Sequence, residues 1–341
     1  MGSVKDLIIL REATEDGSGR ARFLFSDRYS VFDWGEMPDQ IKGKGASTCI
    51  ATAYFFERLE ELGVRTHYLG VVEDEKAVKM GELEGPSDTI EFRLLRVIRP
   101  RIRGGRYDYS VYERAKGNFL IPLEIIYRNA LPEGSSVFRR LREGRLKLDD
   151  IGLEEMPEPE EVLEKPIIEV STKLEAHDRY LSWDEAMKMC CLSEDETDEM
   201  KRITSLINDI ITQDTGKIGL FNEDGKIEFG FDEERNIMVV DALGTLDESR
   251  FTFRGIPVSK EIARTFYRRT TWFEEVSHAK KSGKIEWREV VRSSPPPLPE
   301  DLINSISLVY RAYANELTGR KWFDVPPLAE VLNKLEEVLM E

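Results

Sequence analysis

The spacing of apolar residues predicts short strands and amphipathic helices along the chain. Apolar and aromatic residues dominate 18–34, which we expect to form short strands, and further strands are expected over 89–99 and 119–128. The last of these, FLIPLEIIYR, is almost entirely apolar, so both of its faces should be buried. Residues 47–62 carry an apolar stripe at helical spacing and are followed by Gly63, a common helix stop.

The second half of the chain alternates polar segments with helices. Residues 141–165 are acidic and contain prolines, which indicates an exposed loop or insertion. Ser182 and Glu185 have the spacing of a capping box, which predicts a helix through Cys191. A longer helix is expected over 197–212, because its apolar residues recur at helical spacing and its start is acidic.

The C-terminal part is predicted to be helical. A proline-rich linker at 293–301 precedes a last amphipathic helix, which should run to about Leu317 and end at Gly319. Segregated strands and helices favour an α+β fold. We expect three regions: an N-terminal lobe at 1–118, a larger lobe at 119–292 and a C-terminal helical extension at 293–341.

Composition narrows the class of protein. The chain has 341 residues and a net charge of −16, which disfavours nucleic-acid binding, although local basic clusters can still attract small anions. The three cysteines form neither a disulfide framework nor a zinc motif. No apolar run is long enough for a membrane span, and the N-terminus does not resemble a secretory signal. We therefore expect a cytoplasmic protein with no membrane partner.

The most informative stretch is a charged strand pair at 224–251. Asp224, Lys226 and Glu228 lie two residues apart, so in a strand they share one face, and Asp241 ends an apolar return strand. Carboxylates of this kind can hold Mg²⁺ together with phosphate oxygens, and a neighbouring lysine can neutralise developing charge. The alternative is a solvent-facing strand pair with cross-strand salt bridges.

A second stretch, YRNALPEGSSVFRR at 127–140, suggests an anion site. Arg128 precedes the Gly-Ser-Ser sequence that contains Ser135 and Ser136, and backbone N–H groups, hydroxyls and arginine are all phosphate ligands. The same residues would also suit an ordinary loop in which Ser135 caps a helix.

Two further stretches carry charged residues without a decisive pattern. Lys173 and Asp178 lie in a crowded loop, whose His177 is more simply explained as a hydrogen-bonded loop residue than as a base. The segment that contains Asp33 and Lys44 ends in Gly-Lys-Gly, but the P-loop pattern is absent.

Taken in order, these stretches resemble the SAICAR synthetase family of de novo purine synthesis. The matching pieces span about residues 20–270 and are SDRYSVFD with KGKG, EIIYRNALPEGS, STKLEAHD, DGKIEFG, VDALGTLDESRF and SKEIAR. The C-terminal segment around TGRKWFD is similar to the long form of the archaeal branch.

The resemblance implies an ATP- and Mg²⁺-dependent ligase. Such an enzyme joins L-aspartate to the carboxylate of carboxyaminoimidazole ribotide (CAIR) through an acyl phosphate, and it releases ADP and phosphate. The implied fold is two-lobed, with an N-terminal antiparallel sheet over a larger α+β lobe and ATP between them. The partners would be these small molecules, and a homo-oligomer is possible.

The resemblance also implies roles for individual residues. Lys226, Glu228 and Asp241 would be catalytic, and Glu228 and Asp241 would hold the metal. The residues that would bind substrate are Asp33, Lys44, Arg128, Ser135, Ser136, Arg250, Lys260 and Arg264. Those that would bind ATP are Lys173, Asp178, Lys226 and Glu228.

One departure from the family lies near the N-terminus. Its members usually carry a glycine–lysine loop over the ATP phosphates, whereas the corresponding place here reads LREATEDGSGRARF. Arg11, Arg20 or Arg22 could replace the lysine as a phosphate ligand, although arginine is not equivalent in a tight backbone cradle. Two alternatives therefore stay open: a related ATP-dependent amide ligase with a different donor, and a catalytically inactive nucleotide-binding paralogue.

Overall fold

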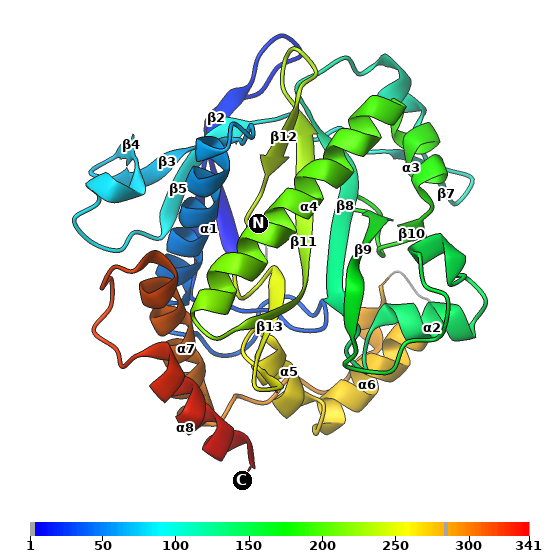
Figure 1. The fold of residues 1–341 in the computed structure, drawn as a ribbon. Coiled ribbons are helices and arrows are strands. Elements are labelled where there is room, and N and C mark those ends of the chain that lie inside the picture. Colours follow the sequence, from blue (N-terminus) through cyan, green and yellow to red (C-terminus); the bar gives the residue numbers. More distant parts are fainter. Residues whose placement is uncertain (1–3, 283–285, 341) are drawn as a thin grey trace.

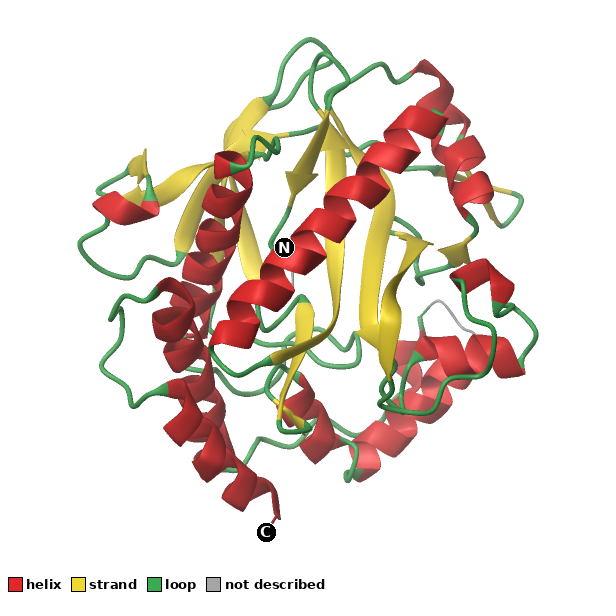
Figure 2. Ribbon diagram, in the orientation of Figure 1, coloured by secondary structure: helices red, strands yellow, loops and turns green. Residues whose placement is uncertain are grey.

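Two antiparallel sheets lie side by side in the computed structural model, which describes residues 4–282 and 286–340. Helices cover both sheets, so the predicted α+β class is confirmed (Figures 1 and 2). A short separate hairpin is formed by β6 (Arg101–Arg103) and β7 (Arg106–Asp108). None of the helices in these residue ranges is long and apolar enough to cross a bilayer.

The smaller sheet contains the N-terminal strands. Its spatial order is β1 (Lys5–Arg11), β2 (Gly19–Phe25), β5 (Thr89–Leu94), β3 (Tyr68–Glu73) and β4 (Lys76–Val78). Helix α1 (Lys44–Glu61) packs against one face of this sheet, where Ala21 and Phe92 are buried. The predicted helix over 47–62 is confirmed, and Gly63 has a positive φ of 73°.

Two strand predictions in this region were too long. The prediction of strands over 18–34 holds only for β2, because the carboxylate of Asp27 accepts hydrogen bonds from the backbone N–H groups of Gly43 and Gly45. Those bonds draw the chain after Phe25 toward the start of α1 and away from the sheet. Strand β5 ends at Leu94 and not at residue 99.

The larger sheet carries the charged strand pair. Its order is β10 (Tyr180–Leu181), β9 (Val162–Thr172), β8 (Phe119–Ala130), β11 (Phe221–Phe231), β13 (Ser249–Phe253) and β14 (Ile256–Pro257). Strand β12 (Ile237–Val240) pairs with the C-terminal half of β11, and β13 pairs with its N-terminal half. The return strand is therefore split, and residues 241–248 leave the sheet between the two halves. Strand β8 is mostly buried on both faces, as predicted.

Helices cover one face of this sheet and its lower end, as seen in Figure 1. The long helix α4 (Glu194–Lys217) crosses in front of β11 and β8 in Figure 1, and a capping box of Ser193 and Glu196 starts it. It contains the predicted helix at 197–212 and extends beyond both ends. Ser182 accepts a hydrogen bond from the N–H of Glu185 and caps α3 (Trp183–Cys190). The shorter α2 (Ser136–Arg142) follows β8.

The C-terminal helices pack on the body of the protein. They are α5 (Glu261–Tyr267), α6 (Thr271–Lys281), α7 (Glu300–Thr318) and α8 (Leu328–Met340). Helix α7 ends at Gly319 as predicted, but it is not the last helix, because α8 follows it and packs on it. Helix α7 also packs on α1. Short 3₁₀ turns occupy Met80–Glu82, Ser110–Arg114, Asp149–Ile151 and Trp287–Val290. The boundaries of the three predicted regions stay predictions.

Candidate active site

Strand β11 brings the predicted charged residues together. The Nζ of Lys226 lies 3.0 Å from Oε1 of Glu124 on the neighbouring strand β8 and 3.8 Å from Oε1 of Glu228. Lys173, at the end of β9, forms an ion pair with Glu228 and lies 3.5 Å from Glu124. Two lysines and two carboxylates from three adjacent strands therefore form one cluster, with Glu248 3.5 Å from Lys226 on its far side.

Asp241 joins this cluster from the split return strand. It follows β12 and has a φ of 71°, a backbone conformation that L-residues other than glycine rarely adopt. Its carboxylate accepts a 2.5 Å hydrogen bond from the Nζ of Lys5 on β1, and its carbonyl oxygen lies 3.3 Å from Nε2 of the buried His67. The N-terminal sheet thus supplies a cation to the predicted metal ligand.

The two predicted metal ligands, Glu228 and Asp241, differ in the direction in which their pKa values are shifted. Burial, together with the charge of Asp241, raises the pKa of Glu228 to about 7, despite the opposing effect of Lys173. Burial would also raise the pKa of Asp241, but Lys5 and Lys173 outweigh it, so that pKa lies below its ordinary value. Burial would lower the pKa of Lys173, but Glu228 and Asp241 raise it instead. A proton that enters the cluster therefore binds to Glu228 in preference to Asp241.

These carboxylates suit a metal that relies on phosphate oxygens. Among the described residues no three His, Cys, Asp or Glu side chains gather closely enough to hold an ion by themselves. Mg²⁺ usually takes only one or two protein carboxylates and completes its shell with water and substrate phosphates. Glu228 and Asp241 are two such ligands, and each is now neutralised by a lysine. The donor set therefore fits Mg²⁺ delivered together with a nucleotide.

A second charged group surrounds the buried Arg128. Its guanidinium donates hydrogen bonds to Glu169 at 2.8 Å and to Asp224 at 3.1 Å, and it reaches the hydroxyl of Tyr180 at 3.0 Å. Arg250 on β13 donates to both oxygens of the same Asp224, at 2.8 and 2.5 Å. Asp224 therefore holds two arginines beside each other, which is an arrangement suited to a phosphate group.

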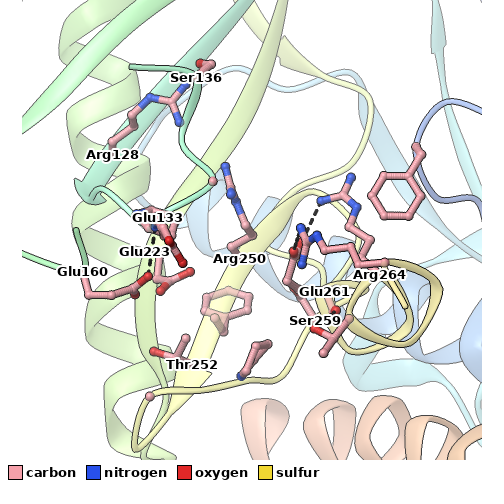
Figure 3. A pocket seen from close by; sticks show the side chains of 18 of the residues that line it. Arg128, Glu133, Ser136, Glu160, Glu223, Arg250, Thr252, Ser259, Glu261 and Arg264 are labelled. Carbon is pink, nitrogen blue, oxygen red and sulfur yellow. Dashed lines mark hydrogen bonds and ion pairs between the residues drawn. The ribbon is translucent and has the colours of Figure 1, made fainter. Parts of the chain in front are cut away.

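The arginines face two adjoining cavities. The larger has a volume of about 800 Å³, and Figure 3 shows Arg128, Arg250 and Arg264 around it. The smaller, of about 330 Å³, reaches Glu124, Lys226 and Glu248. Arg128, Arg250 and Arg264 line both cavities, as does Tyr180. A ligand held by the arginines can therefore extend toward the lysine–carboxylate cluster.

The two candidate serines have different surroundings. The Ser135 hydroxyl is buried and caps α2 by accepting a hydrogen bond from the N–H of Val137. The Ser136 hydroxyl lies 3.1 Å from that of Tyr180, and Ser136 lines the larger cavity. Ser136 therefore presents its hydroxyl to the arginines, whereas the Ser135 hydroxyl is used within the loop.

The remaining substrate candidates lie around the same space. Asp33 lines the larger cavity and forms an ion pair with Lys280 at 2.6 Å. Lys260 and Asp178 line the smaller cavity, and burial lowers the pKa of Lys260. Lys44 is fully buried, and its Nζ lies 2.5 Å from Asp247, a residue of the smaller cavity, so Lys44 supports the wall of this cavity from behind.

The three N-terminal arginines lie elsewhere. Arg20 pairs directly with Arg11 and Arg93 across neighbouring strands, so these side chains share one face of the sheet. The next residue, Ala21, faces the core on the opposite side. Arg11 and Arg20 line a separate cavity of about 430 Å³. Arg22 forms ion pairs with Glu75 at 2.5 Å and Glu91 at 2.9 Å. Lys5 lies on the opposite face of the N-terminal sheet, which is the face directed toward Asp241.

Sequence reasoning missed three charged residues of the cluster. Glu124 was visible as the one charged residue in the apolar run FLIPLEII, and a charge in a buried strand indicates a special role. Lys5 begins the apolar run LIIL, but nothing in the sequence connects it with Asp241. Glu248 follows Asp247 in an acidic loop and has no distinguishing local pattern.

Comparisons with known proteins agree on one family. The family model described as SAICAR synthetase matches residues 10–281. A putative phosphoribosylaminoimidazole-succinocarboxamide synthase of Archaeoglobus fulgidus is 52% identical over 339 residues, which is 99% of this chain and 100% of the relative. The synthase of Thermoplasma acidophilum is 32% identical over 94% of this chain and 98% of its own length.

Solved structures have the same fold. The SAICAR synthase of Saccharomyces cerevisiae complexed with SAICAR has a TM-score of 0.63 at 21% identity and covers 95% of each chain. A SAICAR synthetase in complex with ADP has a TM-score of 0.55 at 23% identity and covers 83% of this chain and 97% of that one.

The family model and the full-length relatives define an ATP-dependent ligase. Within that class, the chain belongs to the SAICAR synthetase family. The predicted family, the predicted fold and the predicted ligase activity in purine biosynthesis are confirmed, and the alternatives of a different donor or an inactive paralogue are not favoured.

Proposed function

We propose that this chain joins L-aspartate to the carboxylate of CAIR at the lysine–carboxylate cluster, using ATP and Mg²⁺. The carboxylate attacks the γ-phosphorus of ATP, the bond to ADP breaks, and an acyl phosphate forms. The amine of aspartate then attacks the acyl carbon, phosphate leaves, and the amine gives up a proton. The observation that carries the proposal is the pair of adjoining cavities, which connects an arginine group with this cluster.

The arginine group is the proposed site of the ribotide phosphate. Arg250 and Arg128 are held side by side by Asp224, and Ser136 offers a hydroxyl nearby. Arg128 already donates to three side chains, two of which are buried carboxylates, so its first role is to position Asp224. The more exposed Arg250 is the better direct ligand. Arg264 lies on the other side of the larger cavity in Figure 3.

The lysine cluster is the proposed site of phosphoryl transfer. Lys226 is held between Glu124 and Glu248, so its ammonium is fixed at the end of the smaller cavity. A fixed cation there stabilises the charge that develops on the transferred phosphoryl group. Glu228 and Asp241 would hold Mg²⁺, which would supply positive charge to neutralise the phosphate groups of ATP. Lys173 and Lys5 would then be released from these carboxylates to contact phosphate.

Lys5 is the proposed N-terminal phosphate ligand in place of Arg11, Arg20 and Arg22. Its ammonium lies at Asp241, whereas the side-chain partners of those three arginines lie outside the lysine–carboxylate cluster. The N-terminal sheet would in this way close over ATP. A cytoplasmic location and a homo-oligomer remain proposals that follow from the family and the composition.

The test is a reconstitution with purified protein. We would supply Mg-ATP, CAIR and L-aspartate, follow SAICAR and ADP by mass, and omit each component in turn. SAICAR that requires all components supports the proposal. ADP without SAICAR would indicate a different amine or acid, and the absence of both products would contradict the proposal. The matched variant Lys226→Met should fold normally and lose turnover, whereas Lys217→Met, on the far helix α4, should keep it.

A further inference from the structure

An unusual carboxylate lines the larger cavity beside the arginines. Glu223 is 7% exposed, and no hydrogen bond or ion pair joins its carboxylate to another side chain in the described part of the protein. The Glu223 carboxylate therefore opens onto the cavity, where it can contact a bound ligand. Its neighbour Asp224, by contrast, is fully engaged by two arginines.

A bulge in strand β11 directs Glu223 into this cavity. The pairing of β11 with β13 shifts between Asn222 and Asp224. Asn222 contacts Asn208 of α4, whereas Asp224 contacts Arg250 in the site. In a regular strand Asn222 and Asp224 would point to the same face of the sheet. They point to opposite faces here because Glu223 is an extra residue between them. Bulges of this kind commonly re-aim side chains next to active sites.

The surroundings of Glu223 are mixed in charge. Figure 3 shows Glu223 close to Glu133 and Glu160, with Arg250 beside them. Burial, followed by the charge of Asp224, raises the pKa of Glu223 to about 7. Arg250 opposes this effect, and the charges of Glu160 on the loop before β9 and Glu261 on α5 add to it. The other charged groups that face the cavity are Asp33 in the loop before α1, Glu133 before α2, Arg128 on β8, and Arg264 and Arg268 on α5 and just after it.

We propose that Glu223 makes the binding of the ribotide phosphate dependent on pH. This inference rests on the proposed function, in which Arg250 holds that phosphate. In its neutral form Glu223 donates its proton in a hydrogen bond to a phosphate oxygen, and in its ionised form it repels the same phosphate. Both effects act in the same direction, because each weakens ribotide binding as the pH rises. Glu223 thus tunes the affinity for the ribotide phosphate next to the arginines and takes no part in the phosphoryl transfer.

The experiment compares the ribotide KM of the wild-type protein and of Glu223→Gln across pH. Glutamine keeps the shape of the side chain and a hydrogen-bond donor but cannot ionise. If bound phosphate raises the pKa of Glu223 by about one unit, the wild-type KM rises about sixfold between about pH 6.5 and pH 8.5. In Glu223→Gln this rise should be absent, apart from the titration of the phosphate itself, which both proteins share.

Two controls make the result specific. Glu133→Gln neutralises an exposed carboxylate of the same cavity and should keep the wild-type pH dependence. Calorimetric binding of the ribotide without ATP should show the same pattern as the KM, since binding and not turnover is affected. Parallel profiles for the wild-type protein and Glu223→Gln, or a flat profile for Glu133→Gln as well, would overturn the role of Glu223. Absence of turnover in the wild-type protein at every pH would instead overturn the proposed function.

Discussion

Lys5 offers a direct test of how the N-terminal sheet contributes to ATP binding. Its ammonium donates to Asp241 across 236 residues of sequence, and both side chains are 19% exposed. We would replace it by methionine, which keeps an apolar side chain of similar length beside the ring of Phe23 and removes the charge that lies over this ring. The variant should fold, because Lys173 still lies near Asp241 and Glu228.

The size of the effect follows from the burial of the pair. A hydrogen bond between charged groups contributes roughly 1.5–3 kcal/mol when water is largely excluded. If Lys5 transfers this interaction to a phosphate of ATP, its loss should lower kcat/KM for ATP by about 10- to 100-fold. The pKa of Asp241 should rise toward its ordinary value, because Lys5 is the strongest of the charges that lower it.

Steady-state kinetics with varied ATP would measure the effect, and Arg20→Met is the matched control. Arg20 is also a cation of the N-terminal sheet, but it lies on the opposite face and forms an ion pair with Glu91. We expect Arg20→Met to change kcat/KM for ATP by no more than about twofold, as for most surface substitutions. Normal kinetics in Lys5→Met, or an equal loss in Arg20→Met, would refute the assignment of Lys5.

Three further predictions concern the larger sheet. Glu228→Gln should lower Mg²⁺-dependent kcat at least about 100-fold with an unchanged circular dichroism spectrum; near-normal rates would remove it from the metal site. Arg250→Ala should mainly raise the ribotide KM. Arg128→Met should instead lower the unfolding free energy, by roughly 1.5–3 kcal/mol in urea titrations, because two buried carboxylates each lose one of the two arginines that hold them; the reverse pattern would mean that Arg128 is the phosphate ligand and Arg250 the structural residue. Glu223 binds its proton more tightly in the folded protein, since its pKa is about 7 there against an ordinary value of 4.5. The wild-type protein should therefore lose stability relative to Glu223→Gln as the pH rises from about 4.5 to above 7. The difference should reach about 2 kcal/mol after allowance for solvent in the cavity, and equal stability profiles would contradict the raised pKa.

Local patterns predicted much of the larger sheet and one face of its site. The alternation in DGKIEFG placed Asp224, Lys226 and Glu228 on one face, because a strand fixes side-chain direction with a period of two. The strand prediction failed after Phe25, although the sequence there is rich in aromatic residues. Asp27 in this segment accepts hydrogen bonds from the start of α1 and so draws the segment away from the sheet. Strand propensity describes the fit to a pleated surface and not the hydrogen bonds that draw a segment away from it.

Contacts between distant segments could not be predicted from local patterns. The pairing of Lys5 with Asp241 depends on how the two sheets meet, and the roles of Ser135 and Ser136 depend on which hydroxyl caps α2. Glu223 is a clearer case still. Simple alternation would place it opposite Asp224, away from the arginines, and only the bulge brings it to the cavity. A sequence pattern carries no signal for such an irregularity.

The C-terminal helices give the split return strand its support. Residues 241–248 leave the sheet, so their backbone lacks ladder partners and needs other contacts. Helix α7 supplies two of them: the Tyr313 hydroxyl donates to the carbonyl of Gly244 at 2.6 Å, and the Tyr310 hydroxyl donates to Asp247 at 2.8 Å. Lys44 at the start of α1 holds the same Asp247 from the other side. The C-terminal extension, which is held on the body by the apolar packing of α7 on α1, therefore also fixes the loop that carries Asp241 and Glu248.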